Sequence, residues 1–320
     1  MIRLGIDLGG TNIAVGIVDE NYQIVHKDSV PTEAHRAPEA IVDDMAMLCR
    51  RVLEARGLTL ADVSGIGIAA PGTINSKDGY VEYSNNIPFH RLPIVAMLRE
   101  RLDNVPVFVD NDANAAAWGE AVAGAAKGTE NSIMITLGTG VGGGIIINNK
   151  LYSGFNGAGG ELGHVVIVAD GAPCSCGRKG CWEAYSSATA LIRMTKEKLD
   201  ECAAQGRSTL MSQLVEKKGR VNGRTSFDAM RAGDAAAKEV VDTYLHYLAC
   251  GIANMINIFQ PEVLSIGGGI SGEGQSLIDA LLPLVRSECY GGDTLTKVTD
   301  LRIAQLGNDA GIVGAALLGL

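Results

Sequence analysis

The segment IRLGIDLGGTNIAVGIV, residues 2–18, contains the pattern on which the fold class depends. Apolar residues alternate with small or charged ones from Ile2 to Asp7, and residues 13–18 form a second run rich in β-branched side chains. Gly9-Gly10-Thr11-Asn12 lies between the two runs. This pattern predicts two strands joined by a tight turn. The glycines therefore belong to a hairpin and do not open a helix, as the Rossmann dinucleotide fingerprint requires.

The second half of the chain contains a similar segment. SIMITL, residues 132–137, predicts a strand, residues 138–144 (GTGVGGG) predict a glycine turn, and residues 145–148 predict the returning strand. Gly138, Gly140 and Gly143 match G-x-G-x-x-G, but strand sequence rather than a helix follows them. One such hairpin in each half suggests two related α/β domains.

The remaining periodicity predicts an alternation of strands and helices, which places the chain in the α/β class. We expect a long polar loop between the Pro-Gly turn at residues 71–72 and Pro88. Further strands are expected at residues 23–30, 64–69, 106–111, 263–266 and 302–305, and helices at residues 38–57, 92–102, 187–204, 225–233, 234–259, 277–289, 310–318 and from about 112.

Composition limits the classes of function. The chain has 320 residues, of which 47% are hydrophobic, so it is long enough for two domains with separate cores. Its net charge of -9 argues against binding to nucleic acid or to an anionic membrane. Seven cysteines, an odd number with three of them within eight residues, indicate a reducing compartment, here the cytoplasm. We expect neither a signal peptide nor a membrane span.

Residues 161–183, ELGHVVIVADGAPCSCGRKGCWE, combine potential metal ligands with carboxylates. One imidazole and three thiolates suit a closed tetrahedral zinc site without an open position for water, which would be structural. The ligands would be His164, Cys174, Cys176 and Cys181. The spacing departs from that of zinc fingers, and the alternative is a surface loop with reduced cysteines and a core histidine. Glycines at 171, 177 and 180 favour converging ligands, and Glu161 and Glu183 flank the cluster.

Three glycine-rich segments each follow a predicted strand: DLGGT, LGTGVGGG and GGGI. Each could be only a turn, but together with the hydroxyls of Thr11 and Thr139 they favour a bound nucleotide, because backbone N–H groups in such turns bind phosphates. Asp7 is suited to hold Mg²⁺, or alternatively to cap its own turn. Asp112 is a candidate general base, or alternatively an N-terminal charge stabilised by its helix.

The motifs DLGGTN (7–12), NDAN (111–114), LGTGVGGG (137–144), ELGH (161–164) and CSCGRKGCWE (174–183) resemble, in this order, those of the ROK family. This family comprises repressors, open reading frames and sugar kinases, and belongs to the actin-like ATPase superfamily. The resemblance extends over essentially the whole chain. It implies a two-domain, ribonuclease H-like α/β fold with the active site in the interdomain cleft. The small N-terminal domain would comprise residues 1–110 and 306–320, and the large domain, with the zinc element, residues 111–305.

The resemblance also implies roles for individual residues. Asp112 would accept the proton of a sugar hydroxyl, and zinc would leave one ring nitrogen of His164 for the substrate. The sugar would contact Gly72, Asn111, Asp112, Glu161, His164 and Glu183. Mg²⁺ and ATP would contact Asp7, Gly9, Gly10, Thr11, Asn12, Gly138, Thr139, Gly140, Gly268 and Gly269.

The function implied by the resemblance is ATP-dependent phosphorylation of a hexose at O6, with details most similar to bacterial glucokinases of the family. Kinases for N-acetylmannosamine, allose or fructose share these residues and remain alternatives, as does a sugar-sensing protein without activity. The cofactors would be ATP, Mg²⁺ and structural Zn²⁺. The expected partners are a small-molecule sugar and further copies of the chain, in a homodimer or dimer of dimers.

Overall fold

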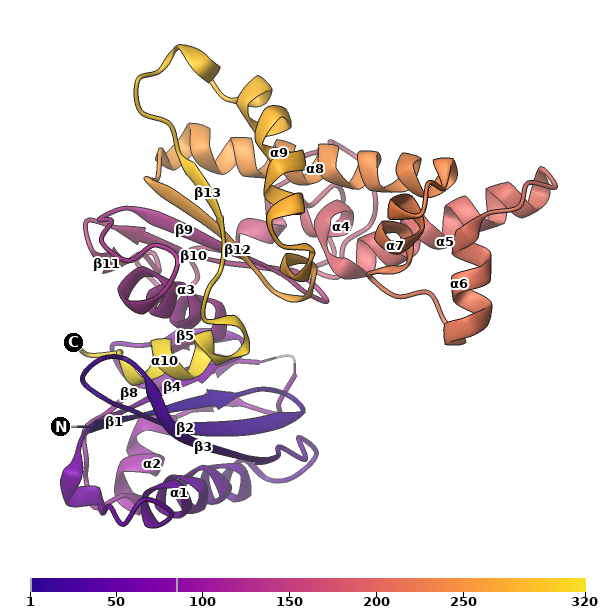
Figure 1. Ribbon diagram of the computed structural model, residues 1–320. Coiled ribbons are helices and arrows are strands. Elements are labelled where there is room, and N and C mark those ends of the chain that lie inside the picture. The colour runs from indigo at the N-terminus through magenta and orange to yellow at the C-terminus, as the bar shows by residue number, and fades with distance from the viewer. Residues whose placement is uncertain (1, 85) are drawn as a thin grey trace. The chain divides into compact units, whose positions relative to one another are not determined.

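The computed structural model describes residues 2–84 and 86–320 (Figure 1). The chain forms two compact units, one of residues 1–134, 143–160 and 304–320 and the other of residues 135–142 and 161–303. These units differ from the expected division after residues 110 and 305, because residues 111–134, 143–160 and 304–305 group with the first unit. The expected domain boundaries stay a prediction.

The first unit is built on a five-stranded sheet of order β3-β2-β1-β4-β8. The predicted hairpin is present: β1 (Ile2–Leu8) and β2 (Asn12–Val18) are antiparallel, with Leu8 opposite Ile13. β3 (Ile24–Pro31) continues the meander, whereas β4 (Val63–Ala70) and β8 (Val107–Asn111) add in parallel on the other side. The carboxyl ends of β1, β4 and β8 therefore meet at one edge of the sheet.

Helices cover both faces of this sheet. α1 (Pro38–Glu54) and α2 (Ile94–Arg101) lie on one side, and α10 (Ala310–Ala316) packs on β1 and β4 and against α3 (Asp112–Ala123) (Figure 1). α1 has the predicted apolar face, in which Ile41, Met45 and Leu48 are fully buried. The first unit also contains a small antiparallel sheet of three strands, β5 (Thr73–Asn75), β6 (Tyr80–Tyr83) and β7 (His90–Leu92).

α10 approaches the sheet at positions where strands carry glycine. A Cβ atom added at Gly5 would overlap the carbonyl oxygen of Ile312, and one added at Gly67 would overlap that of Ala315. At the carboxyl end of α10, the Arg3 guanidinium donates to the carbonyl oxygens of Ala316 and Leu318. The C-terminal helix is thus fixed directly on the first strands of the chain.

We expect Gly67→Ala to destabilise the protein strongly, because the added methyl group meets backbone that cannot rotate away. Overpacking of this kind costs about 1–3 kcal/mol and occasionally more, and the urea midpoint of unfolding measures it. Gly272→Ala is the matched control, since no atom lies within 4 Å of its added Cβ. Equal midpoints for the two variants would contradict the close packing of α10.

A second five-stranded sheet has the order β11-β10-β9-β12-β13, and the second unit includes its strands β12 and β13 and a set of helices. The strands of this sheet are β9 (Ser132–Leu137), β10 (Val141–Ile147), β11 (Lys150–Leu151), β12 (Val263–Gly267) and β13 (Asp300–Ile303). The helices of the second unit are α4 (Glu183–Ser186), α5 (Ala188–Ala204), α6 (Leu210–Lys218), α7 (Thr225–Arg231), α8 (Ala235–Phe259) and α9 (Gln275–Glu288). The 3-10 helices of the chain are η1 (Leu60–Asp62), η2 (Leu162–His164), η3 (Gly269–Glu273), η4 (Gly292–Thr294) and η5 (Gly307–Asp309).

Three local expectations were wrong. The predicted polar loop before Pro88 contains β5 and β6, whose alternation is short and interrupted by a turn. The glycine turn ends at Gly140, and Gly142, Gly143 and Gly144 lie inside β10, where neighbouring strands supply the pairing that glycine itself disfavours. Helix α6 was not predicted, because Met211 is its only fully buried residue in the described structure.

Candidate functional site

Two acidic residues lie at the carboxyl edge of the first sheet. Asp7 stands near the end of β1, and Asp112 is the first residue of α3, directly after β8. Burial, and to a smaller extent the negative charge of Asp112, raises the pKa of Asp7 to about 6. The second cause shows that the two carboxylates are close enough to interact, as a shared cation would require.

The raised pKa of Asp7 predicts a stability change on Asp7→Asn. A carboxyl whose folded pKa is raised stabilises the fold below its unfolded pKa, and this contribution is lost as pH rises through about 6. In magnesium-free buffer at pH 7.5 the variant should therefore be more stable than the parent chain, by at most about 3 kcal/mol. Thermal unfolding between pH 4 and 7.5 measures the difference. A gain that does not shrink towards pH 4 would contradict this explanation.

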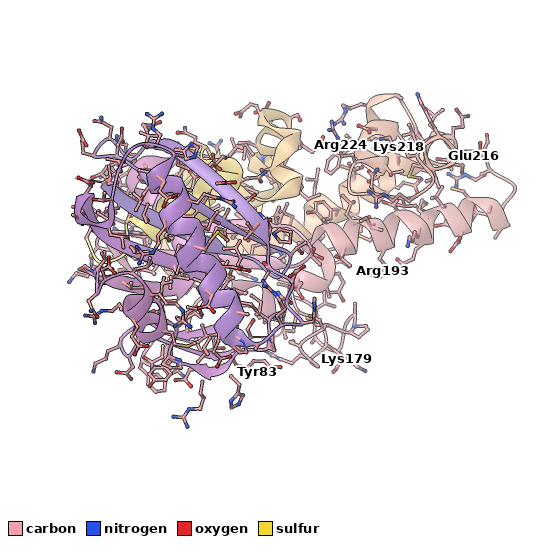
Figure 2. The ribbon with its side chains drawn as sticks, turned by 90° about the horizontal axis from the view of Figure 1, so that it is seen from below. Tyr83, Lys179, Arg193, Glu216, Lys218 and Arg224 are labelled. Carbon is pink, nitrogen blue, oxygen red and sulfur yellow. The ribbon has the colours of Figure 1, made fainter. Side chains whose placement is uncertain are left out.

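Asn111 ties the beginning of α3 to the loop after β4. Its side-chain oxygen accepts hydrogen bonds from the N–H groups of Ala113 and Asn114, at 2.9 and 3.3 Å, and so caps the helix. Its amide nitrogen donates to the carbonyl oxygen of Gly72 at 3.0 Å. Gly72 has φ +105° and packs on the backbone of Tyr83, an exposed residue that is labelled in Figure 2. The structure thus brings Gly72, Asn111 and Asp112 together.

Asp110 is a neighbouring carboxylate that is not among the site residues expected from the sequence. It is buried and accepts hydrogen bonds from Ser76 Oγ (3.1 Å), Asn114 Nδ2 (2.9 Å) and the Asn111 N–H (2.7 Å). Burial raises its pKa, and these three bonds oppose that shift. A carboxylate at the end of the apolar strand PVFVD was the signal that could have identified it. Asp110 fixes the position of the Asn111-Asp112 pair.

The first glycine turn is closed by a hydrogen bond from the Gly9 N–H to the Asn12 carbonyl, at 2.9 Å. Thr32 Oγ1 donates to the Gly9 carbonyl at 2.6 Å, and Thr11 and Asn12 are exposed. Gly10 lies beside Asn86, which a Cβ atom added at position 10 would approach to 3.2 Å. The turn therefore presents accessible backbone at the same edge as Asp7.

The four predicted metal ligands converge in the second unit. The ligand atoms of His164, Cys174, Cys176 and Cys181 all lie within 4.8 Å of one another. His164 Nδ1 is 3.6 Å from Cys174 Sγ, and Cys176 Sγ is 3.7 Å from Cys181 Sγ. A tetrahedral zinc ion with ordinary bond lengths requires about 3.6 Å between nitrogen and sulfur and about 3.8 Å between sulfurs. The donor set and its spacing fit zinc.

Turns in the cysteine segment have a backbone that favours glycine. Gly177 and Gly180 have φ +87° and +78°, and the Gly180 N–H donates to the Ala172 carbonyl at 2.8 Å.

Burial raises the pKa of the Cys181 thiol to about 12. A backbone N–H donated by Arg178 lowers the pKa of the exposed Cys176.

The flanking carboxylates differ in their surroundings. Glu161 is exposed at the start of η2, the 3-10 turn that carries His164. Glu183 is half-buried, and its carboxylate accepts hydrogen bonds from Ser175 Oγ at 3.0 Å and from the Val141 N–H at 3.1 Å. Trp182, between Cys181 and Glu183, is fully buried against Gly251 of α8. The metal segment and its carboxylate are therefore fixed on the core of this unit.

The other two glycine turns lie together. The Gly138 carbonyl accepts a hydrogen bond from the Ala188 N–H at the start of α5, at 2.8 Å. Gly268, with φ +80°, packs on the backbone of Leu137, the last residue of β9. Gly269, next in the chain, is exposed, as are Gly268 and Thr139. Gly138, Thr139, Gly140, Gly268 and Gly269 thus form one accessible backbone surface.

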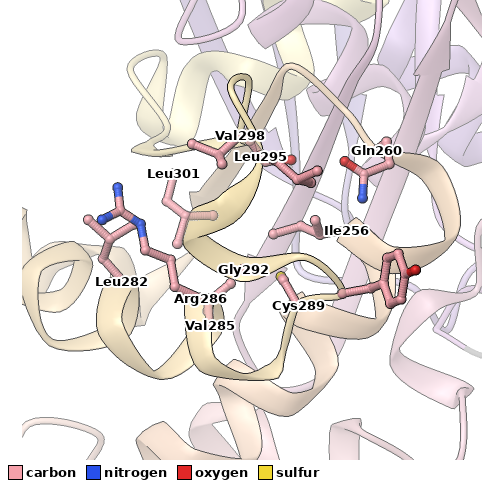
Figure 3. Close-up of a pocket in the computed structure, with 12 residues that line it drawn as sticks. Ile256, Gln260, Leu282, Val285, Arg286, Cys289, Gly292, Leu295, Val298 and Leu301 are labelled. Carbon is pink, nitrogen blue, oxygen red and sulfur yellow. The ribbon is translucent and has the colours of Figure 1, made fainter.

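A separate apolar cavity of about 30 Å³ lies between α8, α9 and β13 (Figure 3). Ile256, Val285, Leu295 and Leu301 are among its lining residues. Its volume suits about one water molecule, so it is too small for a sugar.

Among the described residues, no helix is both long and apolar enough to cross a membrane.

Comparisons with known proteins cover nearly the whole chain. The sequence model of the ROK family matches residues 3–320. The chain is 37% identical to a glucokinase of Halalkalibacterium halodurans over 98% of this chain and 94% of that protein. It is 38% identical to a glucokinase of Streptomyces coelicolor, over 98% and 96%.

A solved structure shows the same fold. The ROK family glucokinase of Streptomyces griseus, in complex with glucose and AMPPNP, superposes with a TM-score of 0.80 at 36% identity, covering 99% of this chain and 98% of that one. This similarity confirms the predicted actin-like α/β fold. The chain, with its strand-glycine-strand hairpins, its NDAN helix start and its converged His-Cys cluster, belongs to the ROK family.

Proposed function

We propose that this protein is an ATP-dependent hexokinase that transfers the γ-phosphate to O6 of glucose. The observation that carries the proposal is full-length similarity, at 36–38% identity, to glucokinases of which one was solved with glucose and an ATP analogue. The described residues support the proposal. They include the Asp112 carboxylate at the start of α3, accessible glycine turns, and Glu161 and Glu183 on either side of the four converging metal ligands.

Asp112 is proposed as the catalytic residue. It would accept the proton of the attacking hydroxyl while Asn111 holds that sugar through its amide group and Gly72 approaches the ring. The position of Asp112 at the start of α3 lowers its basicity. That is compatible with phosphoryl transfer, in which the transition state is loose and positioning provides most of the rate enhancement.

Glu161, His164 and Glu183 are proposed to bind further sugar hydroxyls. His164 turns Nδ1 towards the thiols, which leaves Nε2 available to a hydroxyl. Zinc, held by His164, Cys174, Cys176 and Cys181, would act as a structural ion without an open position. It would fix the tautomer and orientation of His164.

ATP and Mg²⁺ are proposed to bind at the glycine turns. Asp7 would hold the cation, directly or through water, which would also relieve its repulsion with Asp112. The N–H groups of Gly9, Gly10, Thr11, Asn12, Gly138, Thr139 and Gly140 would contact the phosphates, and Gly268 and Gly269 the nucleoside. We further propose that the chain acts as a homodimer or dimer of dimers, which light scattering on the purified protein tests.

A coupled ADP-release assay over a panel of sugars tests the function. We expect the highest kcat/KM with glucose and lower values with N-acetylmannosamine, allose and fructose. A higher value for one of these three would replace glucose as substrate, because related sugars are distinguished by individual polar contacts. No ATP turnover with any hexose would exclude the kinase.

A further inference from the structure

The Glu183 carboxylate connects two loops of the second unit that are far apart in sequence. One oxygen, Oε1, accepts the hydroxyl hydrogen of Ser175, which lies between the metal ligands Cys174 and Cys176. The other, Oε2, accepts the N–H of Val141, the residue that follows the glycine turn 138–140. The side chain therefore spans the metal segment and the turn proposed to bind phosphates.

The turn and the carboxylate also touch directly. A Cβ atom added at Gly140 would overlap Oε2 of Glu183, so the backbone passes close to the carboxylate. The same turn is closed by a hydrogen bond from the Gly138 N–H to the Gly140 carbonyl, at 3.0 Å. A displacement of the Glu183 side chain would therefore displace the turn.

The carboxylate keeps capacity for a ligand. An ionised carboxylate offers about four acceptor sites. The Ser175 hydroxyl and the Val141 N–H each use one, and Cys174 Sγ, which lies 3.6 Å from Oε1, is a third partner. A sugar hydroxyl can bind at a remaining acceptor site without breaking the bonds to Ser175 and Val141. It would then add a further partner to a side chain that already connects both loops.

We propose that the Ser175–Glu183–Val141 connection couples the binding of sugar to the binding of nucleotide, with Ser175 as a positioning residue. This inference rests on the proposed function. A sugar bound to Glu183 immobilises the carboxylate and, through Val141, the glycine turn. The nucleotide then binds to a turn that is already ordered. Less conformational entropy is lost on binding, so the affinity for nucleotide rises. By linkage, nucleotide raises the affinity for sugar by the same factor.

The test measures this coupling in the zinc-loaded protein. Calorimetry gives the affinity for magnesium-AMPPNP with and without saturating glucose. We expect glucose to tighten nucleotide binding at least about fivefold in the parent chain. In Ser175→Ala, the factor by which glucose tightens nucleotide binding should fall to less than half of that in the parent chain. The zinc content should stay unchanged. The substitution should change the KM for glucose more than kcat. Ser175→Thr retains a hydroxyl and should restore the coupling.

The outcomes separate this inference from the proposed function. A parent chain that phosphorylates glucose but shows no change in nucleotide affinity with sugar would overturn the coupling alone. So would an undiminished factor in zinc-loaded Ser175→Ala. Absence of hexose phosphorylation in the parent chain would instead remove the kinase on which the inference rests.

Discussion

Replacing Asp112 by asparagine is expected to lower kcat by about 10²–10⁴-fold, which is the usual contribution of a general base. The fold should persist, because the asparagine oxygen can still accept the N–H of Ala113, as Asp112 does at 2.9 Å. Glucose affinity should change little, since the other proposed sugar contacts remain. Steady-state kinetics together with calorimetry of glucose binding measure both effects.

A second readout follows from the interaction of Asp112 with Asp7. Loss of the charge at position 112 removes one of the two causes that raise the pKa of Asp7, so that pKa should fall.

Asp103→Asn is the control for this substitution. Asp103 is exposed and has φ +52°, which asparagine tolerates, so the variant should leave kcat unchanged. A D112N enzyme that retains more than about a tenth of the parent kcat would exclude Asp112 as the base.

Cys176→Ser is expected to release zinc and to weaken glucose binding at least about tenfold, or 1.4 kcal/mol. Cys176 supplies one of four converging ligand atoms, and three remaining ligands no longer close the tetrahedron. His164 then loses its fixed orientation, and the segment carrying Ser175 no longer holds Glu183. Zinc content by atomic emission and glucose affinity by calorimetry are the measurements.

Cys289→Ser is the matched control, because Cys289 is a half-buried free cysteine at the end of α9, away from the cluster. It should retain zinc and sugar affinity. Zinc-free C176S with the glucose affinity of the parent chain would show that the metal does not position the sugar-binding residues.

The hairpin of β1 and β2 and the long helices α1 and α8 were predictable from sequence, because their apolar periodicity is local and strong. The strand alternation in β5 and β6 spans only a few residues, so the polar composition of that region outweighed it. The local sequence predicts a turn at the glycines of β10, since strand formation there depends on neighbours that this sequence does not reveal.

For the proposed site, too, some features were predictable from the sequence and others were not. The convergence of His164 with three cysteines was predictable, because the ligands lie within one short segment. The role of Asp110 was not, and neither was the connection of Ser175 through Glu183 to Val141, since both depend on partners brought close only by the fold: Ser76 is 34 residues from Asp110, and Val141 is 42 residues from Glu183. Residues that act through such long-range hydrogen bonds leave no spacing motif.

The packing of α10 on β1 and β4 has a consequence for the order in which the protein folds. Arg3 contacts residues 313 and 315 positions further along the chain, so one face of the first sheet stays open until residue 318 has been synthesised. Contacts of such sequence separation form slowly. During translation the glycine-lined face of β1 and β4 is a surface that a chaperone, or another nascent chain, can reach before α10 covers it.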